Sequence, residues 1–83
     1  MISFKQAYKI ARKEITDSWK IIRILDAPEF WLFCDERSEI MPIGYNPIAV
    51  NKKDGRVWGV FPPAMTDEQL EALENAKEVE VPL

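Results

Sequence analysis

The chain of 83 residues is long enough for one domain and too short for two, and its 47% hydrophobic residues argue against intrinsic disorder. It contains no His and a single Cys, which excludes an intrachain disulfide and removes the commonest general base and zinc ligand. A formal net charge of -3 is too mild to imply a nucleic-acid partner. No run approaches 18 apolar residues, and the N-terminus lacks a basic region followed by an apolar one. We therefore expect a single soluble, cytoplasmic domain over residues 1–83 with no membrane partner.

The charges are distributed unevenly along the chain. Residues 1–25 carry six basic side chains against two acidic ones, whereas residues 64–83 carry six acidic side chains against one basic one. One interpretation is two solvated helix faces, which are ordinary on exposed helices. The other is attraction between the two ends, within a monomer or across a dimer, in which each exposed pair would contribute about 0 to 1 kcal/mol.

An amphipathic helix is predicted over residues 4–18. Ser3 and Gln6 fit a capping box, in which each side chain bonds the backbone N–H of the other residue. The opposite faces of the helix are basic and apolar, and the aromatic side chains fall on the apolar face, so nucleic-acid binding is not expected. The apolar positions, at three- and four-residue spacing, are Phe4, Ala7, Tyr8, Ala11, Ile15 and Trp19.

Two antiparallel strands are predicted next. Residues 19–25 are rich in β-branched side chains and too short for another helix, and Pro28 marks the turn after them because proline cannot donate to a sheet. The apolar run Phe30–Cys34 fits a central strand, since both of its faces are apolar. Cys34, inside this run, is interpreted as a small buried hydrophobic residue rather than a nucleophile.

The stretch NPIAVNKKDGRVWGVF, residues 46–61, is predicted to form a β-hairpin. Two β-prone runs flank a polar turn, and the glycine of its Asp-Gly pair can adopt the positive φ that the last turn residue needs. A three-residue turn would pair Val50 with Trp58. It would also pair Ile48 with Val60. All four side chains would then share one face, on which we expect the first helix to pack.

The C-terminal part is predicted to form a short helix over residues 67–77, opened by a second capping box of Thr66 with Gln69. Residues 79–83 alternate like a strand, and a frayed tail is an equal alternative. Together these elements predict an α+β domain, with the N-terminal helix packed on an antiparallel sheet of about four strands. The short C-terminal helix is expected on the same face of that sheet.

No arrangement of residues in the sequence indicates catalysis. The Ser and Thr hydroxyls have no His to activate them, and the three glycines form no phosphate-binding loop. Between the second strand and the hairpin, residues 35–46 have no periodicity and are predicted to be a loop, either functional or a plain connection. Asp35, Glu36 and Glu39 in this loop could in principle hold a cation, but the glycine and alternating oxygen ligands of an EF-hand are missing. We expect that the protein is not an enzyme and that it binds neither a metal ion nor a cofactor.

Several features of the sequence occur together in a recognisable order. The segment MISFKQA opens the first helix, the aromatic strand at residues 30–34 and a loop follow, and residues 44–57 read GYNPIAVNKKDGRV. In this combination nearly the whole chain resembles the small bacterial YrhB-like, or immunity protein 35, family. In that family a G-x-x-P-hydrophobic-V-(D/N)-K-x-(S/T)-G-x-(V/I) segment is the recognisable core. Asp54 stands where Ser or Thr is usual, which is a harmless change in a turn.

The resemblance implies a non-enzymatic α+β domain that acts as an immunity protein in a bacterial polymorphic toxin system. Such a protein binds a cognate protein toxin stoichiometrically and blocks its active site or an essential surface. We place the binding surface on the 35–45 loop and the strand before it, where acidic side chains would pair with basic residues of the toxin and speed association. The alternative is a chaperone-like or scaffold domain without a dedicated toxin, and a homodimer is the further partner considered. The residues assigned to partner binding are Trp31, Asp35, Glu36, Glu39 and Tyr45.

Overall fold

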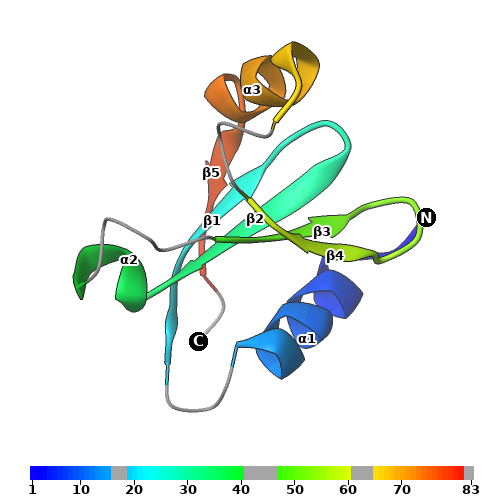
Figure 1. Ribbon diagram of the computed structural model, residues 1–83. Coiled ribbons are helices and arrows are strands. Elements are labelled where there is room, and N and C mark those ends of the chain that lie inside the picture. The colour runs from blue at the N-terminus through cyan, green and yellow to red at the C-terminus, as the bar shows by residue number, and fades with distance from the viewer. Residues whose placement is uncertain (16–18, 41–46, 61–64, 82–83) are drawn as a thin grey trace.

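The computed structural model describes residues 1–15, 19–40, 47–60 and 65–81 (Figure 1). Its strands form one antiparallel sheet in the order β4-β3-β2-β1-β5, so the predicted α+β fold is confirmed, with five strands where about four were expected. None of the described helices is long and apolar enough to cross a membrane. In chain order the elements are α1 (Phe4–Glu14), β1 (Ile21–Asp26), β2 (Phe30–Asp35), α2 (Arg37–Ile40), β3 (Ile48–Asn51), β4 (Val57–Gly59), α3 (Asp67–Glu74) and β5 (Lys77–Val79).

Strand β2 is the central strand, as predicted, and every one of its residues is buried. Successive side chains of a strand point to opposite faces of the sheet. Trp31 and Phe33 therefore belong to the apolar cluster on one face, and Phe30 and Leu32 to the cluster on the other. A strand that is apolar on both faces needs a cover on each side.

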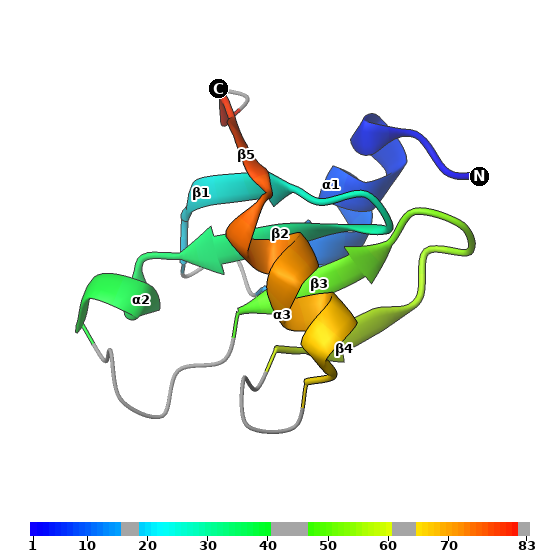
Figure 2. The same ribbon diagram turned by 90° about the horizontal axis from the view of Figure 1, so that it is seen from above.

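The two longer helices supply these covers from opposite sides of the sheet (Figures 1 and 2). Helix α1 packs Ala7 and Ala11 into the cluster that contains Phe33. Helix α3 packs Ala72 and Leu73 against the other cluster. The expectation that both helices lie on one face is therefore wrong, because it would have left one apolar face of β2 in water.

Helix α1 begins at the predicted capping box and ends earlier than expected. The Ser3 hydroxyl accepts a 3.2 Å hydrogen bond from the Gln6 backbone N–H, and the Gln6 side chain accepts one of 2.8 Å from the Ser3 N–H. The helix ends at Glu14 because Ile15 is extended and its side chain is fully buried in the core. The rest of the predicted helix, residues 16–18, lies outside the described residues.

Helix α3 also begins at its predicted capping box, formed by Thr66 and Gln69. It ends at Glu74 rather than at residue 77, because the chain turns into β5, which pairs antiparallel with β1 at the edge of the sheet. The sequence predicts either a strand or a frayed tail from Val79 onward, and Val79 pairs with Ile24 of β1 as the last residue of β5.

The β3–β4 hairpin forms where predicted, but its register is shifted by one residue. Val50 pairs with Val57, and Trp58 pairs with Ala49 instead of Val50. A shift of one residue moves a side chain to the other face of the sheet. Trp58 therefore packs on the α3 side, with its ring centroid 5.4 Å from that of Phe30, whereas Val50 stays on the α1 side.

The cause of the shift is a loop of four residues, 52–55, where three were expected. The Asn51 N–H donates a 2.8 Å hydrogen bond to the Arg56 carbonyl and so closes the loop one residue further out. Gly55 has a φ of 77°, in agreement with the predicted left-handed glycine. A Cβ atom at this position would lie 3.1 Å from the Cδ1 atom of Ile10, so the loop packs closely against α1.

Candidate functional site

Of the residues assigned to partner binding from the sequence, those that the structure describes do not form one surface. Trp31 and Asp35 lie near opposite ends of β2. The four residue steps between them in an extended strand correspond to about 13 Å. Tyr45 lies outside the described residues. Partner binding by these residues stays a prediction.

Trp31 is a core residue with 9% of its surface exposed. Its ring meets the Phe4 ring edge-to-face at a centroid distance of 5.8 Å. The Lys52 ammonium lies 4.9 Å from the centre of the Trp31 ring and also forms an ion pair with Asp26. Trp31 is thus held between α1 and the hairpin loop, and little of its ring is available to a partner.

Among the described residues, Asp35 is the one charged side chain that is buried. Its carboxylate accepts a 2.8 Å hydrogen bond from the Arg37 backbone N–H and one of 2.6 Å from Nη2 of the same residue. The Arg37 guanidinium lies 5.6 Å from the centre of the Trp19 ring, and the Trp19 carbonyl accepts a 2.9 Å hydrogen bond from Arg12. Asp35 therefore joins the start of α2 to the segment between α1 and β1, and its carboxylate is not on the surface.

Glu36 and Glu39 lie in the predicted loop, which contains the unexpected short helix α2. The Glu36 side chain accepts a 2.8 Å hydrogen bond from the Lys20 N–H, and its own N–H donates to the Lys20 carbonyl over 3.0 Å. Glu39 is exposed, and its side chain makes no hydrogen bond or ion pair with a described residue. Of the four assigned residues that the structure describes, Glu39 is the one whose charged group is free to meet a partner. Within the described ranges, no group of three His, Cys, Asp or Glu residues could hold a metal ion.

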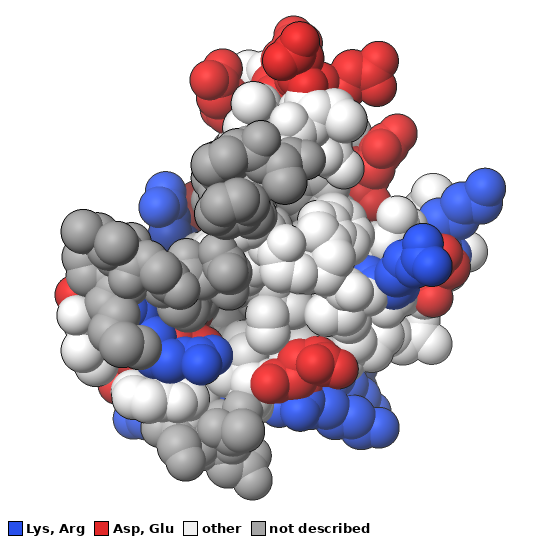
Figure 3. All heavy atoms as spheres, viewed as in Figure 1, with Lys and Arg blue, Asp and Glu red and all other residues white. Residues whose placement is uncertain are grey.

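A second acidic region lies on α3, and acidic side chains gather at the top of the space-filling view, where Figure 1 places this helix (Figure 3). Asp67, Glu68, Glu71 and Glu74 are all exposed, and we call them the acidic surface. The sequence of the helix, DEQLEALE, contains no basic residue, and none of the four carboxylates forms an ion pair within the described part of the chain. Packing of Ala72 and the neighbouring leucine on the sheet turns these carboxylates outward. The acidic run was visible in the sequence, but nothing there placed it apart from the basic residues.

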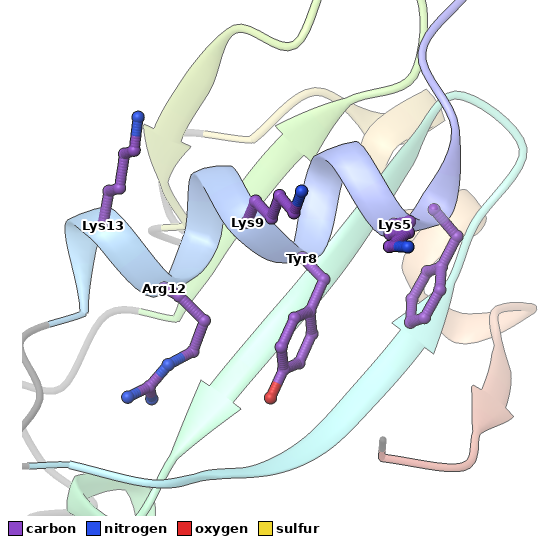
Figure 4. Close-up of a pocket in the computed structure, with 6 residues that line it drawn as sticks. Lys5, Tyr8, Lys9, Arg12 and Lys13 are labelled. Atoms are coloured by element: carbon purple, nitrogen blue, oxygen red, sulfur yellow. The ribbon is translucent and has the colours of Figure 1, made fainter. Parts of the chain in front are cut away.

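Helix α1 carries the opposite charge on its outer face, across the sheet from α3. Its side chains line a hollow of about 600 Å³, which we call the α1 groove (Figure 4). Sequence reasoning missed this groove because it assigned the aromatic side chains of the helix to the buried side, whereas they are half-buried at its edge. The lining residues are Phe4, Lys5, Tyr8, Lys9, Arg12 and Lys13.

One ion pair between described residues joins the basic N-terminal part of the chain to the acidic C-terminal part. Arg23 in β1 lies 2.7 Å from Glu78 in β5, with 58% and 64% of the two side chains exposed. Such an exposed pair contributes at most about 1 kcal/mol. The charges of α1 and α3 lie on different faces of the sheet, so ion pairing between the two ends is limited to this edge among the described residues.

Cys34 is buried in β2, as predicted. Burial raises the pKa of its thiol, Arg23 opposes this shift, and the neighbouring Asp35 adds to it. A buried thiol that keeps its proton is a poor nucleophile, because the thiolate is the reactive form. The structure therefore gives Cys34 a packing role.

Comparison of the chain with protein-family models, with curated proteins and with solved structures found no match.

Proposed function

We propose that the chain is a cytoplasmic interaction protein that neutralises a cognate bacterial protein toxin by stoichiometric binding, and that its acidic surface contacts the toxin. The observation that carries the proposal is the set of exposed carboxylates on α3, none of which forms an ion pair with a described residue. The resemblance of the sequence to the immunity protein 35 family supports the class of partner.

The acidic surface is suited to a basic partner because its charges repel one another in the free protein. Glu71 lies four residues after Asp67 and three before Glu74, so their side chains are neighbours on one helix. Like charges at these spacings destabilise a helix by about 0.2 to 0.5 kcal/mol per pair. A cationic surface would relieve this repulsion, and electrostatic steering would speed association at low salt. This agrees with a binder that must reach its toxin quickly.

The proposal is tested with the protein encoded by the neighbouring gene, as the candidate toxin. Expression of that protein alone should arrest growth, and co-expression of this chain should restore it. Titration calorimetry on the purified pair should give one-to-one binding.

The variant Glu71→Lys/Glu74→Lys reverses two of the negative charges of the acidic surface and leaves the start of α3 unchanged. Lysine is favourable near the C-terminal end of a helix, so this variant should fold. The matched control, Glu14→Lys/Glu80→Lys, changes two exposed residues elsewhere by the same net charge. We expect at least a tenfold loss of affinity, or about 1.4 kcal/mol, from the α3 variant and little change from the control.

Two results would overturn parts of the proposal. If the wild-type chain neither binds the neighbouring gene product nor restores growth, the immunity function is wrong. If Glu36→Gln/Glu39→Gln abolishes binding while the α3 variant retains it, the contact surface is the 35–45 region assigned from the sequence. Glutamine at residue 36 can keep the hydrogen bond from Lys20, so this variant tests charge rather than folding.

A separate experiment tests the chaperone-like alternative. The large apolar side chains exposed among the described residues are Met1, Ile22 and Ile40, which come from three separate segments. A chaperone-like domain would suppress the aggregation of an unrelated heat-denatured client, measured by light scattering, and would not need the neighbouring gene product.

A further inference from the structure

We propose that the α1 groove binds an acidic amphipathic helix of a partner protein. This goes beyond the toxin contact proposed for α3, because the groove lies on the opposite face of the sheet and has the opposite charge.

Two parallel ridges on α1 form the walls of the groove. Phe4, Tyr8 and Arg12 are four residues apart and form one ridge. The neighbouring ridge consists of Lys5, Lys9 and Lys13. The hollow between two such rows is the feature that receives a ridge of a second helix, at an interaxial distance of about 8 to 10 Å. The shape of the groove therefore favours a helix as its occupant.

The aromatic ridge is fixed in place by the protein core. The Phe4 ring packs on Trp31, and the Tyr8 ring lies edge-to-face with Phe33 at a centroid distance of 6.3 Å. On the inner side of α1, Ala11 is fully buried against the sheet. Figure 4 shows Tyr8 extending from the helix as part of this wall. The aromatic wall of the groove is thus preformed, and binding would not have to order it.

The other ridge supplies charge that no described residue neutralises. Lys5, Lys9 and Lys13 are exposed, and none forms an ion pair with a described residue. Successive lysines are separated by about 6 Å along the helix axis. Carboxylates four residues apart on a partner helix have the same spacing, so a row of them can face this ridge.

The wall chemistry favours an acidic helix over a nucleic acid. The half-buried aromatic surface on one wall calls for apolar surface in the occupant, which the side chains of a helix supply. Bases can stack on such rings, so the short length of the basic row is what argues against a nucleic acid. The lysine row spans only about 12 Å, and the net charge of -3 repels a long polyanion. A short segment with apolar residues on one stripe and glutamates beside it satisfies both walls.

The probe for this inference is a fluorescently labelled synthetic helical peptide with glutamates four residues apart and leucine and phenylalanine on the adjoining stripe. Binding to the full chain is measured by fluorescence anisotropy. The groove variant is Lys5→Glu/Lys9→Glu, in which residue 5 lies in the first turn of α1, where an acidic side chain is favourable, and residue 9 is exposed in the middle of the helix. The matched control is Lys53→Glu/Arg56→Glu, two exposed hairpin residues with the same change in charge. Circular dichroism checks that both variants are folded.

We expect the groove variant to bind the peptide at least about tenfold more weakly and the control to bind within about twofold of wild type. A peptide with its leucine and phenylalanine replaced by serine should lose affinity by a similar factor. Three results would overturn the inference: an equal loss in both variants, a single-stranded oligonucleotide that displaces the peptide and requires the same lysines, or self-association of the chain that the groove variant abolishes. The last two would identify a nucleic acid or a second copy as the occupant. Because the toxin experiment varies α3, its failure would leave this result unaffected.

Discussion

The buried carboxylate of Asp35 accepts hydrogen bonds from Arg37, two residues further along the chain, at 2.6 Å from the guanidinium and 2.8 Å from the backbone N–H. The side chain of Asp35 is 1% exposed and that of Arg37 is 31% exposed. Removal of one partner of a buried pair leaves the other without compensation. We expect Asp35→Ala to lower the free energy of unfolding by about 2 to 3 kcal/mol, below the usual range for a fully buried pair because Arg37 can recover some water.

Urea unfolding measures this loss, with Glu39→Ala as the exposed control from the same segment. The control should change stability by no more than about 0.5 kcal/mol. Asp35→Asn keeps the shape and one acceptor, so its loss should be smaller than that of Asp35→Ala. Equal stability of wild type and Asp35→Ala would contradict the structural role assigned to this carboxylate.

The capping box of α3 should have a large local effect, because this helix has only eight residues. Thr66→Ala removes the acceptor for the Gln69 N–H and should cost about 1 kcal/mol. Amide hydrogen exchange should increase through α3 before it increases in β2. Thr66→Ser retains the hydroxyl and should leave the exchange pattern nearly unchanged.

The glycine at position 55 is required by backbone conformation and by contact with α1. Its φ is 77°, and a Cβ atom would lie 3.1 Å from Ile10. Gly55→Ala should destabilise the protein by about 1 to 2 kcal/mol. Gly59→Ala, at an exposed position without a positive φ, is the comparison and should be much less costly. Thermal unfolding measures the difference. If Gly59→Ala lowered the midpoint temperature more than Gly55→Ala, the packing described for the hairpin loop would be contradicted.

The buried thiol of Cys34 predicts a pH effect. Burial raises its pKa in the folded protein above the ordinary value of 9.0, so the unfolded chain loses this proton first as the pH increases. The thiol therefore contributes stability that is present below pH 9.0 and declines above it. The difference in unfolding free energy between wild type and Cys34→Ala should shrink as the pH is raised from neutral into this range. A thiol reagent should modify native Cys34 only slowly and the urea-unfolded chain quickly.

Local sequence signals predicted the elements of the fold well. Both capping boxes depend on residues three positions apart, and their hydrogen bonds formed as expected at Ser3 and Thr66. The hairpin register was not predictable in the same way, because one extra loop residue before Arg56 changes the face of every side chain in β4. Helix α2 has only four residues and is held by the pairing of Asp35 with Arg37, which no periodicity reveals.

The candidate surfaces were predictable only in part. The acidic run that contains Glu71 was visible as charge, but its isolation on one side of the sheet required the position of α3. The α1 groove depends on Tyr8 being half-buried rather than fully buried, which follows from how α1 sits on the sheet. Asp35 was expected at the surface because aspartate usually is, and its ion pair with Arg37 explains the exception.

The sheet is bounded on each side by a strand of three residues, β4 at Val57–Gly59 and β5 at Lys77–Val79. A long, flat edge strand would offer a row of unpaired backbone N–H and C=O groups with which strands of other molecules could pair. Here each border presents only a few such groups, and the charged side chains of Arg23 and Glu78 stand beside one of them. Short edge strands flanked by charged side chains disfavour strand pairing between molecules, so we expect the sheet edges to contribute little to aggregation.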